Sequence, residues 1–175
     1  MGHPIKHFIT ITKHRHKVIR FCFKMGIGMQ GLFHDLSKYS LEEFLVGCKY
    51  YSGNCSPNSK ERQLKGYSKA WMHHKGRNKH HLEYWVDIDL TTNKYEAVKV
   101  PINYVKEMIA DRVAASLIYY KDKYHDDIPL KYFLDKDNGL KIHPETYSLL
   151  LNWLILVSEK GHLEAFKIIK KIKDY

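Results

Sequence analysis

The amino-acid sequence predicts an all-α protein of one domain spanning residues 1–175, a helical bundle with one small peripheral β-hairpin. Three observations lead to this expectation. Several long stretches without internal Gly or Pro carry apolar residues at spacings of three and four, which is the period of an amphipathic helix. Proline or a Ser/Glu pair stands where several of these stretches begin, as at helix N-termini. Only residues 86–100 alternate with a period of two around a turn.

The composition is that of an ordinary globular protein and excludes a disordered chain. Apolar residues make up 44% and charged residues 27% of the sequence. No apolar run approaches the roughly 18–20 residues that a membrane span needs, and the N-terminus lacks signal-peptide features. Three cysteines without CxxC spacing indicate reduced thiols and a cytoplasmic protein. The net charge of +10 fits a nucleic-acid-binding surface, a cleft for a phosphorylated substrate, or solubility alone.

The first helix is expected from Ile5 to Met25, directly after Pro4. Its apolar stripe includes His14, whereas His16 falls among the charged residues of the opposite face. We therefore favour His14 as the inward-facing histidine. The simpler interpretation, a core histidine bonded to a backbone carbonyl, stays open at this point.

A short second helix is expected over Met29–Ser37, after Gly26 and Gly28 end the first. It would carry His34 and Asp35, and an imidazole next to a carboxylate is a ready pair of metal ligands. A third helix should follow from Leu41 to about Tyr51, because Ser40 and Glu43 form a capping box. The polar segment Ser59–Lys65 is compatible with another helix.

Histidines are densest between Tyr67 and Trp85. The pairs at 73–74 and 80–81 bracket a Gly-Arg-Asn turn, so one helix should end near Lys75 and the next should begin with Asn78 as its cap. One histidine of each pair could then point at a common centre. We favour His74 and His81, although the sequence does not separate either from its neighbour. A polar aromatic surface with clustered histidines is the alternative.

A long helix is expected from Pro101 to about Tyr124. Asp111 shares a face with Tyr104, Met108, Ala115 and Ile118, where an unpaired carboxylate would be costly unless it bound a metal. Glu107, one turn earlier, could orient a ligand, but an ordinary exposed glutamate is the expectation. After a loop at residues 135–139, two helices should follow, from Pro144 to Gly161 and from His162 to about Lys173. They should form part of the apolar core and cover it.

The candidate ligands offer only nitrogen and oxygen donors, which suit a divalent ion with bound water. Mn, Fe, Zn, Co, Ni and Mg are not distinguished. His14, His34, Asp35 and Asp111 would hold one ion. With His74 and one of His80 or His81 added, the donors suffice for a second ion, bridged by Asp35. Basic residues near the rim would bind phosphate oxygens, with Asn78 beside them: Lys38, Lys75 and Arg77.

This order of residues resembles the HD superfamily of metal-dependent phosphohydrolases: His, then His-Asp followed by Lys, then further His, then Asp. More closely, the sequence looks like the bacterial DUF5662 family of uncharacterised function in Thr10-Ile11 with His14, Gly31–Ser40 with Glu43-Phe44, Trp71–His81, Glu107-Met108 with Asp111, and His143–Thr146. The HD resemblance implies an all-helical core, His14, His34, Asp35 and Asp111 as the metal set, and hydrolysis of phosphate esters, often of nucleotides. The gap from His14 to His34 is shorter than in most HD members, so His7 and His16 remain alternative first ligands.

We therefore expect a metal-dependent phosphohydrolase, either a phosphomonoesterase or a phosphodiesterase, acting on a small phosphorylated metabolite or nucleotide. Asp35 or Asp111 would orient the metal-activated water, and Lys38 with Arg77 would offset charge in the transition state. The extra histidines also resemble the two-metal branch of the superfamily, which includes di-iron oxygenases. A basic helical nucleic-acid-binding protein is the alternative from another class, with Tyr67, Trp71, Tyr84 and Trp85 stacking on bases. A degenerate HD fold with a purely structural metal is the third.

Overall fold

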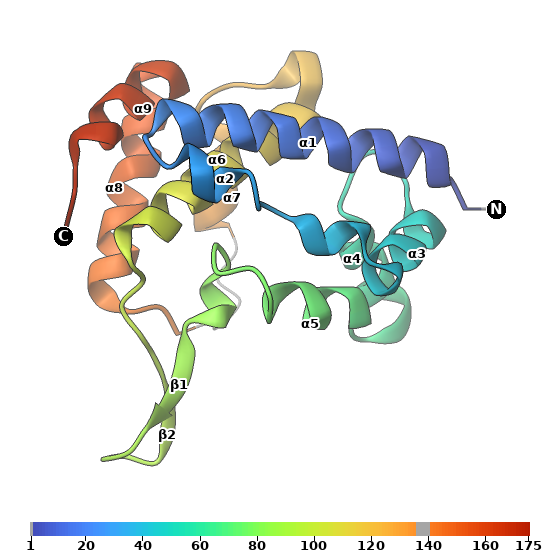
Figure 1. Ribbon diagram of the computed structural model, residues 1–175, viewed down its shortest axis with the longest axis horizontal. Coiled ribbons are helices and arrows are strands. Elements are labelled where there is room, and N and C mark those ends of the chain that lie inside the picture. The colour runs from blue at the N-terminus through green and yellow to red at the C-terminus, as the bar shows by residue number, and fades with distance from the viewer. Residues whose placement is uncertain (1, 136–140) are drawn as a thin grey trace.

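The computed structural model describes residues 2–135 and 141–175, and within them it is all-α with one small two-stranded sheet, as the sequence predicts (Figure 1). In chain order the elements are α1 (Pro4–Lys24), α2 (Gly28–Gly31), η1 (Leu36–Tyr39), α3 (Leu41–Tyr50), α4 (Pro57–Lys65), α5 (Lys69–Lys75), η2 (Leu82–Tyr84), β1 (Val86–Asp89), β2 (Lys94–Ala97), α6 (Ile102–Tyr120), η3 (Lys121–Lys123), α7 (Ile128–Leu134), α8 (Pro144–Lys160) and α9 (His162–Lys171). The loop expected at residues 135–139 lies almost wholly outside the described residues. Within these same ranges, no helix combines the length and apolar character needed to cross a bilayer.

Helix α1 runs along one side of the molecule and connects two groups of helices (Figure 1). It packs against α3 on one side and against α6 and α9 on the other. Its buried stripe follows the predicted period and includes His7, Ile11, His14 and Val18. Because this stripe faces both groups, α1 carries buried histidines into the space between them.

The apolar core lies at the C-terminal half of α1, where α6, α8 and α9 meet. Fully buried members include Val18, Met25, Val105, Ile109, Leu150, Leu154, Phe166 and Ile169. Burying side chains of this size stabilises the fold by about 1.5–3 kcal/mol each. The predicted role of the last two helices as core and cover is therefore confirmed, and this core fixes the position of α6 relative to α1.

The second helix differs from the prediction. A continuous helix over Met29–Ser37 was expected, but α2 ends at Gly31 and residues 32–35 form a turn before η1. Asp35 has a φ of 55°, in the left-handed region that only a few non-glycine residues, Asp among them, adopt readily. His34 and Asp35 are therefore presented by a turn and not by a helix.

Contacts from α1 hold this turn in place. The guanidinium of Arg15 donates to the carbonyls of both His34, at 3.1 Å, and Leu32. Gly31 lets the backbone approach α1 closely, because a Cβ there would lie 2.5 Å from Cβ of Cys22. The two Arg15 bonds span 17 and 19 residues in sequence, so local periodicity carries no sign of them.

The histidine-rich region also differs from the helix-turn-helix prediction. Helix α5 ends at Lys75 as expected, but no helix starts at Asn78; the chain turns and then forms the short η2. The long helix that follows ends at Tyr120 and continues into η3, slightly earlier than expected. Helix α7 had no counterpart in the sequence-based prediction.

The predicted hairpin is present. Strands β1 and β2 pair antiparallel in the register Val86 with Ala97 and Asp89 with Lys94. Figure 1 shows the hairpin projecting away from the helices, which confirms that it is peripheral.

Candidate metal centre

The first donor group brings together the four ligands that the sequence singled out. His14 comes from α1, His34 and Asp35 come from the turn after α2, and Asp111 comes from α6. Nε2 of His14 lies 2.9 Å from Oδ1 of Asp111. Nε2 of His34 lies 3.2 Å from Oδ2 of Asp35. Residues distant in sequence therefore converge on one small volume.

The geometry of this first group suits a metal ion. The measured separations between its donor atoms run from 2.9 to 3.7 Å. Four donors arranged tetrahedrally about an ion at about 2.1 Å are about 3.4 Å apart. The donor set thus fits a cation of that size without rearrangement of the backbone.

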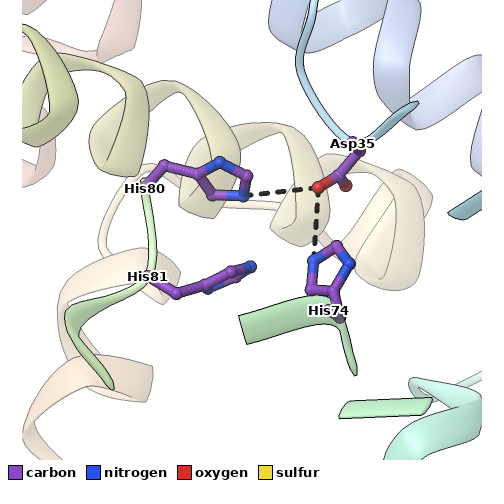
Figure 2. A group of neighbouring side chains, drawn as sticks. All are labelled: Asp35, His74, His80 and His81. Atoms are coloured by element: carbon purple, nitrogen blue, oxygen red, sulfur yellow. Dashed lines mark ion pairs between the residues drawn. The ribbon is translucent and has the colours of Figure 1, made fainter. Parts of the chain in front are cut away.

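A second donor group shares Asp35 with the first and adds three histidines: His74, His80 and His81. Nε2 of His74 and Nε2 of His80 each lie 3.3 Å from Oδ1 of Asp35. Figure 2 shows the three imidazoles turned toward this carboxylate. Because Oδ2 of Asp35 faces the first group and Oδ1 faces the second, Asp35 is placed to bridge two ions.

Several polar atoms of the centre lack hydrogen-bond partners among the described residues. Both oxygens of Asp35 and Nε2 of His80 and of His81 are buried without a hydrogen bond of acceptable geometry. Buried polar groups in native proteins are paired almost without exception, because leaving one unpaired costs about 1–3 kcal/mol. Oδ2 of Asp35 is ion-paired with Nζ of Lys38 at 2.5 Å, which leaves three such atoms together, as expected of a site that could bind a cation.

Carboxylates behind the imidazoles fix the orientation of the rings. Oε1 of Glu107 lies 2.8 Å from Nδ1 of His34 and 3.1 Å from Nδ1 of His80. Both Nδ1 atoms face this oxygen, which holds the two rings with Nε2 toward Asp35. Carboxylate–histidine pairs of this kind are typical of metal centres, where they set the tautomer and raise ligand basicity. Glu107 is only 4% exposed, so the expectation of an exposed glutamate is wrong.

Glu43 plays the same part for His74. Its Oε2 lies 2.8 Å from Nδ1 of His74, and its Oε1 lies 2.7 Å from Nδ1 of His73. Nε2 of His73 in turn lies 2.7 Å from Oε2 of Glu42. His73 therefore positions Glu43 and is not itself part of a donor group, which settles the choice between His73 and His74. The backbone N–H of Glu43 also donates to Oγ of Ser40, which is the N-cap residue of α3.

Charges in the centre are strongly coupled. Burial raises the pKa of Asp35, but His34, Lys38 and His74 outweigh it and hold that pKa well below its usual value. Burial opposes protonation of His80, yet Asp35 and Glu107 raise its pKa to about 10. His81 shows the reverse, because burial and the positive charges of His80 and His74 lower its pKa. A neutral His81 is the form that binds a metal.

Lys38 lies at the edge of the first group, as the sequence predicts. Its Nζ is 2.5 Å from Oδ2 of Asp35, and 28% of its side chain is exposed. Burial lowers the pKa of Lys38, but Asp35 and Asp111 raise it overall, so the ammonium stays charged. A fixed cation at the rim of the centre is suited to binding a phosphate oxygen.

The other predicted phosphate-binding residues lie elsewhere. Arg77 is exposed, and its guanidinium donates to the backbone carbonyl of His73 at 3.2 Å. Lys75 is partly exposed near the end of α5. Asn78 is buried and donates to Ser37 Oγ and to the carbonyl of His74, each at 2.8 Å. Asn78 thus ties η1 to α5, a structural role that the sequence did not suggest.

The three candidates for the first ligand differ in position. His14 belongs to the first donor group, and His16 is exposed. His7 is buried but belongs to neither donor group. At the second pair of histidines the structure selects both members, since His80 and His81 join the same group, with ring centroids 4.2 Å apart. Sequence reasoning did not select the orienting Glu43 and Glu107, and it left His80 as an alternative to His81. The sequence signals for Glu43 were its place in the capping box and in the Glu43-Phe44 pair that carries the family resemblance.

A comparison with known families gives one match. The model of a family described as "Family of unknown function (DUF5662)" matches residues 3–155. No curated protein and no solved structure shows significant similarity to the chain. The match includes every residue of both donor groups, together with Glu43 and Glu107.

Proposed function

Because the chain belongs to DUF5662, a family described without a function, we propose its activity from the centre itself: a metal-dependent phosphohydrolase of the HD type. The observation that carries this proposal is the carboxylate of Asp35, whose two oxygens each face a separate donor group. A bridged pair of divalent ions bound there would lower the pKa of a bound water for attack on phosphorus.

The chain's own residues supply the rest of the proposed reaction. Asp111, with 21% of its side chain accessible, would orient the attacking water. Lys38 would bind a phosphate oxygen and offset charge as it develops in the transition state. Arg77, bonded to the backbone of α5, is not assigned a part in this scheme.

The substrate is proposed to be a phosphomonoester or phosphodiester of a small metabolite or nucleotide. All three cysteines are free thiols, and we propose a cytoplasmic site of action on this ground. The nucleic-acid-binding alternative has less support, since two of the four aromatic side chains that it would use are engaged in packing. Trp71 lies against His74 and His81, and the indole N–H of Trp85 donates to the carbonyl of Lys79.

A di-iron oxygenase is the second candidate. It is favoured by the second donor group, in which three imidazoles and one bridging carboxylate form a nitrogen-rich site that iron accepts well. The two candidates share the ligands and differ in the chemistry that the bound metals perform.

The test begins with protein purified without chelator. Elemental analysis should give about two divalent ions per chain, and a panel of phosphomonoesters and phosphodiesters should contain a hydrolysed substrate. His14→Gln should lose an ion and the activity, whereas the matched change His16→Gln, two residues away on the exposed face, should lose neither. Stoichiometric metal with no hydrolysis of any ester would overturn the phosphohydrolase, and oxygen consumption by the iron-loaded protein would then favour the oxygenase.

A further inference from the structure

A small cavity lies beside the first donor group. It measures about 50 Å³ and shares Lys38 with the metal centre. Its lining includes the polar residues His7, Thr10, Tyr51, Asn58 and Tyr119. Neither the family description nor the proposed hydrolysis assigns these residues a role.

Two helices fix the distance between the cavity and the metal centre. His7 precedes His14 by seven residues on α1, and Tyr119 follows Asp111 by eight residues on α6. At 1.5 Å per residue, these spacings correspond to about 10–12 Å along each helix. His14 and Asp111 form one contact of this helix pair, and His7 and Tyr119 line the cavity further along it. Lys38 stands between the two.

The cavity holds a buried nitrogen without a partner. His7 is 6% exposed, and its Nδ1 makes no hydrogen bond within the described residues. Gly47 makes room for the ring, because a Cβ there would lie 2.1 Å from Nε2 of His7. Burial and the positive charge of Lys38 lower the pKa of His7 to about 4, so the imidazole is neutral. Its unpartnered Nδ1 can bond a neutral hydroxyl group without charge repulsion.

A chain of hydroxyl groups leaves an acceptor nearby. Thr10 Oγ1 donates to the carbonyl of Lys6 at 2.9 Å, so the hydroxyl of Tyr51, 2.9 Å away, must donate to Thr10. The lone pairs of the Tyr51 oxygen then remain for a ligand hydroxyl. The lining is thus suited to an uncharged polyol end, held by acceptors and donors in turn.

The volume limits what can enter. A water molecule takes up about 30 Å³ in the liquid, so a cavity of about 50 Å³ admits only a group of a few non-hydrogen atoms. Pockets for drug-sized ligands begin at about 300 Å³. A nucleobase is therefore too large, whereas a short hydroxylated carbon chain fits.

We propose that this cavity binds the alcohol portion of the substrate, and that the substrate is a phosphate ester of a short polyol of about three carbons and not a nucleotide. The inference rests on the proposed hydrolysis for its orientation, with phosphate at the metals and Lys38 and the hydroxylated end beside His7 and Tyr51. It narrows the substrate class and assigns a specificity role to residues outside both donor groups.

The first test compares esters in the metal-loaded protein. Glycerol 3-phosphate should be hydrolysed with a kcat/KM at least about tenfold above that of adenosine monophosphate, the scale on which a pocket discriminates by shape. Methyl phosphate, which has nothing to place in the cavity, gives the basal rate. A preference for the nucleotide would overturn the proposal.

The second test fills the cavity. Asn58→Phe should raise KM for glycerol 3-phosphate about tenfold while leaving metal content and the hydrolysis of methyl phosphate unchanged. The matched control is Asn54→Phe, because Asn54 is exposed on the preceding loop and does not line the cavity. Equal effects of Asn58→Phe on both esters would contradict a specificity role.

A binding measurement separates this inference from the proposed activity. Glycerol 3-phosphate added to the protein as purified should shift the imidazole NMR signals of His7 in the wild type and in Asn54→Phe, but not in Asn58→Phe. If no ester is hydrolysed and the shift still occurs, the phosphohydrolase fails and the polyol site stands. If the His7 signals do not move, the site fails whatever the activity.

Discussion

Nδ1 of His34 lies 2.8 Å from Oε1 of Glu107, and the same carboxylate oxygen lies 3.1 Å from Nδ1 of His80. One glutamate on α6 therefore orients an imidazole from each of the two donor groups. Gln30 adds a hydrogen bond of 2.5 Å to the other oxygen, which holds the carboxylate in place. This arrangement links the two groups through a residue that need not touch either ion.

Glu107→Gln should weaken metal binding at both groups. The glutamine side chain is neutral and has no charged oxygen to accept both Nδ1–H bonds. The two rings therefore lose their fixed tautomer and orientation. Changes to orienting residues of this kind cost about 10- to 100-fold in metal affinity. Competition with a chromophoric chelator measures the affinity, with Glu159→Gln on the exposed face of α8 as the control. Unaltered affinity in Glu107→Gln would show that ring orientation is set by packing alone.

Asp35→Asn should remove both ions, whereas Asp111→Asn should affect only the first group. Asp35 belongs to both groups and Asp111 to one. Asparagine is the suitable replacement because it also tolerates the left-handed backbone at residue 35, where φ is 55°. Elemental analysis after dialysis measures the number of ions, and Asp122→Asn on the surface controls for the loss of one charge. Equal losses in the Asp35 and Asp111 variants would contradict the bridging assignment.

Sequence reasoning recovered the parts of the fold that local patterns determine. Helices α1, α3, α6, α8 and α9 follow apolar periodicity, the first four with proline or serine at their starts, and the hairpin follows its period of two. The turn that presents Asp35 was missed because Arg15 holds it from another helix. Amphipathic spacing could not report such a contact.

In the donor groups, too, local patterns predicted some residues, and contacts between helices decided the others. His14, His34, Asp35 and Asp111 were predicted from a buried face and an unusual residue pair, and all four converge. His81 was favoured without being separated from His80, and the expectation that only one of the two would face the centre assumed a helix, on which neighbours diverge. In the observed turn both rings face Asp35. Glu43 was not predicted as an orienting residue because its distance to His74 depends on how α3 packs against α5.

Glu61 should make the stability of the helix pair α4–α5 depend on pH. Its buried carboxylate accepts hydrogen bonds from Ser68 Oγ at 2.8 Å and from Lys65 Nζ at 3.0 Å. Burial raises the pKa of Glu61, but these bonds lower it overall below its ordinary value of 4.5. A lowered pKa in the folded state stabilises the protein above pH 4.5, and this contribution is lost as the pH falls toward the folded-state pKa.

Glu61→Gln should therefore lower the free energy of unfolding by about 2 kcal/mol at pH 7. The difference from the wild type should shrink as the pH falls below about 4.5. Urea unfolding at pH 7, 5 and 4 measures both effects, with Glu159→Gln again as the control for charge. A difference that stayed constant across this range would show that the hydrogen bonds do not depend on ionisation of Glu61.

Arg15→Lys should loosen the turn that presents His34 and Asp35. The guanidinium bonds two carbonyls of this turn at once, whereas an ammonium lacks the planar fork and would keep at most one of these bonds well formed. Because Asp35 adopts a left-handed conformation, the turn needs such external support, and we expect a loss of about 1 kcal/mol of stability. Metal affinity should fall with it, since two donors of the first group, His34 and the bridging Asp35, lie on this turn. Thermal unfolding and chelator competition measure the two effects, with Arg20→Lys on the exposed face of the same helix as the control. Wild-type affinity in a destabilised Arg15→Lys protein would mean that the bound metals, and not Arg15, hold the turn in its active conformation.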